Sequence, residues 1–183
     1  SVGGICTVVG DQLRFYYIGF KGGDSSSYMH SNGATGMATL RRDGFASMST
    51  TGEGSLTTHP VKFSGKYMFV NVNCPAGELK VEILDKNNKV IDGFSADKCK
   101  AVTIDSTIQQ VEWNGASDLS SLAGQEVRFR FKLKNGDLYA FWVSPSTNGE
   151  SNGYVAGGGP GYTSNKDTEG KKAYEKASGF QKF

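Results

Sequence analysis

With 183 residues, the chain is long enough for one domain, and its 37% hydrophobic content suffices for one core. The formal net charge of +2 gives no bulk electrostatic reason to bind nucleic acid or an anionic membrane, so neither is an expected partner. No stretch approaches the roughly 18 apolar residues of a transmembrane helix. The 25 glycines and 11% aromatic residues favour strands joined by tight turns.

Three short turn sequences predict β-hairpins along the chain. Gly10-Asp11, Asp43-Gly44 and Asn135-Gly136 each separate two segments with a period of two. Asp-Gly and Asn-Gly are strong hairpin signals, because both central residues of a type I′ turn need a positive φ. The predicted strand pairs are 5–9 with 12–20, 36–42 with 45–50, and 126–133 with 138–143.

Four further segments have strand character: 67–73, 78–84, 89–91 and 109–113. In the second of these, Leu79, Val81 and Ile83 point to one side and the charged residues between them to the other, which predicts one buried and one wet face. About ten short strands without a convincing amphipathic helix predict an all-β fold, an antiparallel β-sandwich of jelly-roll-like type.

Two regions depart from the strand pattern. Residues 21–35 form a Gly/Ser-rich loop that contains His30, and the chain after residue 145 is polar and Gly-rich. We expect an extended C-terminal tail with one short helix at 171–178. The expected organisation is a hairpin and loop over 1–35, a β-sandwich over 36–144 and a Gly-rich tail over 145–183.

The register of the hairpin at Asn135-Gly136 generates the candidate binding site. A two-residue turn would place Phe129 opposite Trp142 and Phe131 opposite Ala140, so that Trp142 shares a core-facing stripe with Phe129, Phe131, Leu133 and Leu138. The other face would combine cations with aromatic rings. Its candidate ligand-binding residues are Arg128, Arg130, Tyr139 and Phe141, beside Lys132.

The first predicted hairpin differs, because both of its faces are largely apolar. Cys6, Val8, Leu13, Phe15 and Tyr17 share one face, and Ile5, Tyr16 and Ile18 share the other. Since strands covered on both sides have this pattern, we expect the hairpin to bridge to another layer of structure.

No catalytic motif is found. The histidines, His30 and His59, lie in turn-rich sequence without a nucleophile elbow, and we assign no catalytic residue. The carboxylates sit mostly at predicted turns, where solvation explains them. We expect no cofactor, although Asp92, Asp97 and Asp105 offer hard oxygen ligands for a structural Ca²⁺; any metal site is otherwise unknown.

Cys6, Cys74 and Cys99 form no CxxC pair, and their odd number leaves at least one thiol free. Two interpretations stay open. The cysteines serve as small buried hydrophobic residues, or Cys74 and Cys99 form a disulfide.

Several short motifs, in order, resemble a known family. They are residues 38–48 (ATLRRDGFASM), 54–58 (GSLTT), 69–72 (FVNV), 78–85 (ELKVEILD) and 138–142 (LYAFW). Together they resemble the C-terminal region that follows five-bladed propeller catalytic domains in bacterial proteins similar to glycoside hydrolases of the invertase and arabinanase type. Residues 3–17 look like the end of such a propeller. The resemblance covers about residues 1–162.

The resemblance implies an accessory β-sandwich whose catalytic carboxylates lie in a separate propeller, so this chain would not be an enzyme by itself. Because the sequence starts at Ser1 without a signal segment, we expect a processed product or a fragment. The resemblance implies a bacterial protein, and we expect it to be secreted or periplasmic. One hypothesis is a carbohydrate-binding module that positions a polysaccharide or oligosaccharide. The alternative is a purely structural module that stabilises the propeller and binds no sugar.

Overall fold

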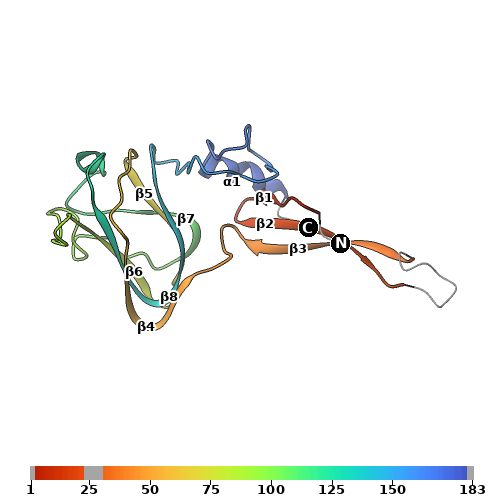
Figure 1. The fold of residues 1–183 in the computed structure, drawn as a ribbon, viewed down its shortest axis with the longest axis horizontal. Helices are drawn as coiled ribbons and strands as arrows, with labels where there is room; N and C mark the ends of the chain where they lie inside the picture. Colours follow the sequence, from red (N-terminus) through yellow and green to blue (C-terminus); the bar gives the residue numbers. More distant parts are fainter. Residues whose placement is uncertain (1–2, 23–30, 181–183) are drawn as a thin grey trace.

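The computed structural model describes residues 3–22 and 31–180 and has an all-β, sandwich-like fold built on two antiparallel sheets (Figure 1). The small sheet has the strand order β1–β2–β3, and the large sheet has the order β4–β8–β5–β7, with β6 also paired to β8. The strands are β1 (Thr7–Val9), β2 (Gln12–Phe20), β3 (Gly33–Arg41), β4 (Met48–Thr57), β5 (Tyr67–Asn73), β6 (Glu78–Leu84), β7 (Asp105–Val111) and β8 (Arg128–Ser144). The helices are η1 (Ser120–Leu122), α1 (Lys171–Ala177) and η2 (Ser178–Phe180).

Strand β8 organises the large sheet. Its residues 128–134 pair with β6 and residues 137–144 pair with β5, while β4 pairs along its other side. Asn135-Gly136 therefore lies inside one continuous strand, and the predicted hairpin at this position is wrong. The Asn-Gly sequence suggested a turn, and Asn135 does have a positive φ of 43°. This φ kinks the strand between the half that pairs with β6 and the half that pairs with β5.

Strands β5 and β6 run in line along β8 and are joined by a tight turn opposite this kink. The turn brings the backbone so close to β8 that a Cβ on Gly77 would overlap the carbonyl oxygen of Lys134. A Cβ on Gly136 would lie 2.6 Å from the carbonyl oxygen of Asn73. Glycine is needed at both positions because the two chains approach each other without room for a side chain.

The core of the large sheet is a single cluster that receives side chains from β5, β6, β7 and both halves of β8. Its fully buried members include Met68, Val70, Leu79, Val81, Ile83, Phe129 and Phe131. Both halves of β8 therefore contribute to one core.

The predicted core stripe is correct for four of its five residues and wrong for Trp142. Phe129, Phe131, Leu133 and Leu138 are buried, but Trp142 is not among their neighbours. Phe141 takes the core position, with its ring centroid 4.9 Å from that of Phe131. The kink at Asn135-Gly136 and a bulge at Tyr139 shift the alternation of side chains, which reverses the faces after residue 138.

Trp142 lies on the opposite side of the sheet from this core. Its ring stacks on Phe69 at a centroid distance of 5.6 Å, and its Nε1 donates a hydrogen bond of 3.0 Å to the carbonyl oxygen of Gly149. Trp142 thus fixes the segment that follows β8 rather than filling the sandwich core.

The other two predicted turns have different outcomes. The hairpin at Gly10-Asp11 is confirmed, with Val8 opposite Leu13. Asp43-Gly44 does form a turn, with the Gly44 amide donating to the Arg41 carbonyl at 3.0 Å, but β3 and β4 belong to different sheets. The predicted hairpin there is wrong, because β3 finds its partner in β2 over nine residue pairs.

The region predicted as an extended tail packs against the small sheet. Val155 is buried with Val8 and Leu13, and the backbone of Gly157 and Gly158 hydrogen-bonds to Cys6 and Val8 along the edge of β1. The run of glycines permits this contact, since a Cβ on Gly157 would collide with Ile5 and Cys6, and a Cβ on Gly159 would collide with Val8. The predicted helix is confirmed as α1 and η2.

The predicted boundary after residue 35 falls inside β3, so the first 35 residues do not separate from the rest of the small sheet. His30, and residues 23–30 of the predicted Gly/Ser loop, lie outside the described residues.

A double-mutant cycle tests the corrected face of β8. Because the Phe131 and Phe141 rings are in contact, Phe131→Ala and Phe141→Ala are expected to be non-additive, with a coupling of about 0.5–3 kcal/mol in the free energy of unfolding. Phe131→Ala combined with Trp142→Ala should add within about 0.5 kcal/mol, since these rings lie on opposite faces. Denaturant melts of the single and double variants measure both cycles. Equal coupling in the two cycles would contradict the register described here.

Candidate functional site

The four predicted ligand-binding residues do not form one platform. Phe141 packs against the core. The guanidinium of Arg41 lies over the ring of Tyr139, with 4.6 Å between the Arg41 Cζ and the ring centroid. Arg128 donates a hydrogen bond of 3.1 Å to the carbonyl oxygen of Thr58. The predicted arrangement of arginines beside exposed rings depended on the hairpin register. Because that register is wrong, these residues do not come together in this way.

Arg130 forms an ion pair with Glu82. The alternation of side chains in β6 had predicted Glu82 to lie on a solvent-exposed face. Glu82 is only 4% exposed and lies between Arg130 and Lys132, at 2.9 and 3.4 Å. A carboxylate with so little exposure requires such partners, because desolvating an unpaired charge is costly. The outer face of β6 is therefore polar as predicted, but at Glu82 it is buried.

Arg41 joins the small sheet to the large sheet. Its Nε donates to the Asn71 side chain at 2.7 Å, its Nη2 donates to the carbonyl oxygen of Val72 at 3.0 Å, and its Nη1 forms an ion pair with Asp105. Together with the stacking on Tyr139, these contacts reach β5, β7 and β8 from the last residue of β3.

Arg42 joins the same junction to the C-terminal segment. Its guanidinium donates to Asp167 at 2.8 Å, with the two side chains 8% and 2% exposed, and it lies over the rings of Tyr162 and Tyr174. Burial would lower the pKa of Arg42, but the surrounding tyrosines and Asp167 outweigh it and raise that pKa. Burial raises the pKa of both tyrosines, so they stay neutral around a permanent cation.

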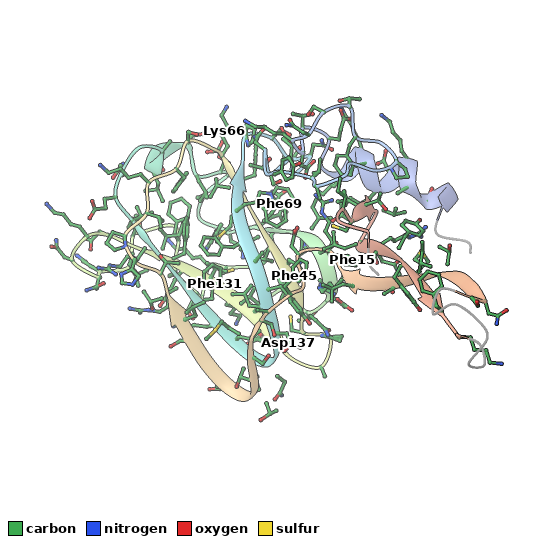
Figure 2. The ribbon with its side chains drawn as sticks, turned by 45° about the vertical axis from the view of Figure 1, so that its right-hand side comes forward. Phe15, Phe45, Lys66, Phe69, Phe131 and Asp137 are labelled. Carbon is green, nitrogen blue, oxygen red and sulfur yellow. The ribbon has the colours of Figure 1, made fainter. Side chains whose placement is uncertain are left out.

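Aromatic packing adds to the junction from the exposed side. Phe15 of β2 and Phe45 of the β3–β4 connection lie next to each other where the sheets meet, with ring centroids 6.4 Å apart (Figure 2). Phe45 is nonetheless 72% exposed, so this edge-on contact covers only part of its ring.

The far half of the β2–β3 ribbon exposes apolar side chains on both faces. Tyr16 and Met37 are directly opposite each other on one face and are 46% and 43% exposed. Tyr17, on the other face, is 42% exposed and its ring lies over Gly36, where a Cβ would overlap it. The apolar two-faced hairpin was visible in the sequence, but its pairing with β3 was not. Residues 36–42 were predicted as a strand paired with 45–50, and residues 33–35 were predicted as loop.

The other residues considered as metal ligands or catalytic groups do not come together in the parts of the chain that the structure describes. Asp92 and Asp105 pair with Lys98 and Arg41, and no three of His, Cys, Asp and Glu come together as metal ligands within residues 3–22 and 31–180. His59 is exposed on a connection. No helix among the described residues is long and apolar enough to cross a membrane.

The three cysteines are free thiols, so the Cys74–Cys99 disulfide is not formed. Both residues are buried, in line with their interpretation as small hydrophobic residues, and burial raises the pKa of each thiol.

Comparison with known proteins gives no assignment. No protein-family profile, no curated protein and no solved structure matches the chain.

The Arg42–Asp167 ion pair is expected to be essential for stability. Asp167→Ala leaves the buried guanidinium with only the more distant, exposed carboxylate of Asp43, 3.6 Å away, and should cost about 3–5 kcal/mol in the free energy of unfolding. Asp167→Asn should cost less, because an amide oxygen still accepts hydrogen bonds. Glu112→Ala is the control, since Glu112 contacts Lys100 at the similar distance of 2.9 Å but is exposed, and should cost at most about 1 kcal/mol. Similar losses for Asp167→Ala and Glu112→Ala in urea melts would refute the assignment.

Proposed function

We propose that this chain is a non-catalytic accessory β module that docks its small sheet on a neighbouring β domain. The observation that carries the proposal is the exposed apolar surface on both faces of the β2–β3 ribbon. The resemblance of the sequence to regions that follow glycoside hydrolase propellers supplies the expected neighbour, a five-bladed propeller of a polysaccharide-degrading enzyme.

Exposure along the small sheet changes abruptly. At its base, Val8 and Leu13 are covered by the C-terminal segment and are 3% and 5% exposed. Beyond that point the ribbon projects away from the rest of the molecule (Figure 1), and Tyr16, Tyr17 and Met37 are each more than 40% exposed. Apolar side chains gathered on both sides of a strand pair are typical of strands covered by further layers of protein.

The hypothesis that Arg128, Arg130, Tyr139 and Phe141 bind a glycan has less support than its structural alternative. A sugar platform needs exposed rings beside free hydrogen-bonding groups. Phe141 is in the core and Arg130 is held by Glu82, so this set offers neither in one place. A structural role is the function that the arrangement supports best.

Hydrogen–deuterium exchange tests the docking proposal by comparing this chain with the complete product of its gene. Docking predicts that amides of β2 and β3 gain protection in the complete product while those of β5 and β6 are unchanged. In the complete product, Met37→Ser should lower that protection without shifting the melting curve of the isolated chain.

Ile104→Ser is the matched control, because Ile104 is 44% exposed, close to the 43% of Met37, but precedes β7 in the large sheet. It should leave the protection of β2 and β3 unchanged. If exchange in β2 and β3 is the same in the isolated chain and the complete product, the sheet has no docked neighbour and the proposal fails.

A further inference from the structure

A groove on the outer face of the large sheet gathers three lysines. It has a volume of about 430 Å³ and runs between β4 and β6 over β8. Its charged and hydroxyl-bearing lining residues are Glu53, Ser55, Glu78, Lys80, Lys132 and Lys134. The groove is hollow because Gly54 and Ser55 of β4 lie beside long side chains of the neighbouring strands.

The middle of this groove holds two like charges face to face. Lys80 of β6 is directly opposite Lys132 of β8, and Ser55 of β4 is opposite Lys132 on its other side. Directly opposed residues on one face have Cβ atoms about 4.5–5.5 Å apart, and like charges at this spacing destabilise a sheet. An anion between the two ammonium groups would remove that repulsion.

The lysines of the groove are held loosely by their carboxylates. Lys132 lies 3.4 Å from Glu82, Lys134 lies 3.5 Å from Glu53, and Lys80 lies 3.8 Å from Glu78. The Glu82 carboxylate is moreover shared with Arg130.

Two lysines outside the groove make closer ion pairs. Lys98 and Lys100 lie 2.8 and 2.9 Å from Asp92 and Glu112, within the range of charge-assisted hydrogen bonds. The three groove ammoniums therefore keep donors for a further acceptor.

The geometry points to a binding site for an acidic saccharide, with a sulfate or carboxylate group bound between Lys80 and Lys132. Lys134 adds a third cation at one end of the groove. The carboxylates of Glu53 and Glu78 accept hydrogen bonds from sugar hydroxyls, and Ser55 both donates and accepts. This mixture of ammonium, carboxylate and hydroxyl groups suits a ligand that carries both anionic and hydroxyl groups, and it suits a bare inorganic anion less.

This groove lies on β4, β6 and β8, whereas the docking surface lies on β2 and β3. The two proposals therefore stand or fall separately.

Binding is measured by calorimetry and affinity electrophoresis with dextran sulfate, dextran and inorganic sulfate at constant ionic strength. Dextran sulfate should bind, neutral dextran should not, and inorganic sulfate should bind at least tenfold more weakly than the polymer per sulfate group. The double variant Lys80→Gln/Lys132→Gln should weaken dextran sulfate binding at least tenfold. Lys98→Gln/Lys100→Gln removes the same net charge from lysines outside the groove and should change the affinity less than twofold.

Equal losses in the two double variants would mean that dextran sulfate binds by overall charge, which overturns the proposal. Absence of dextran sulfate binding by the unmodified chain overturns it as well. Thermal melts provide a second readout, because a ligand that binds the folded state raises the melting temperature. Dextran sulfate should raise the melting temperature of the unmodified chain and of Lys98→Gln/Lys100→Gln, and leave Lys80→Gln/Lys132→Gln unchanged.

Discussion

Arg41 and Arg42 stand side by side at the end of β3, and neighbouring residues of an extended chain point to opposite sides. Arg41 reaches into the large sheet, where Asn71, Val72 and Asp105 accept its hydrogen bonds. Arg42 turns to the C-terminal segment and pairs with Asp167. The backbone between them is held too, since the Asn71 side chain donates to the Arg42 carbonyl at 2.6 Å. These two consecutive arginines thus connect the small sheet, the large sheet and the C-terminal segment.

Much of the architecture follows from local sequence signals. Strands β5 and β6 begin and end where their patterns predicted, because unbroken runs of apolar or alternating residues leave little choice of face or length. The same reasoning failed at Asn135-Gly136 and Asp43-Gly44. A positive φ is a property of the backbone at one residue, and whether it reverses the chain depends on which partner strands are available in the folded protein.

The candidate site was lost through two errors, the hairpin predicted at Asn135-Gly136 and the bulge at Tyr139 that no local signal indicated. Once Asn135-Gly136 lies within a strand, the side-chain alternation shifts, Phe141 enters the core and the arginines find partners inside the molecule. The pairing of Lys80 with Lys132 needs contact between β6 and β8, about fifty residues apart in the chain. No local pattern indicates which strands will be neighbours at that separation, and the groove consequently emerged only from the fold.

The proposed docking surface on β2 and β3 depends on the arginine junction, because the junction sets how the small sheet projects from the large one. Amide residual dipolar couplings test this claim most directly. If the junction is rigid, one alignment tensor fits the couplings of β2, β3, β5 and β8 together. The double variant Arg41→Gln/Arg42→Gln, which removes both charges of the junction, should then need separate tensors for the two sheets. Separate tensors already in the unmodified protein, or one shared tensor in the variant, would contradict the account.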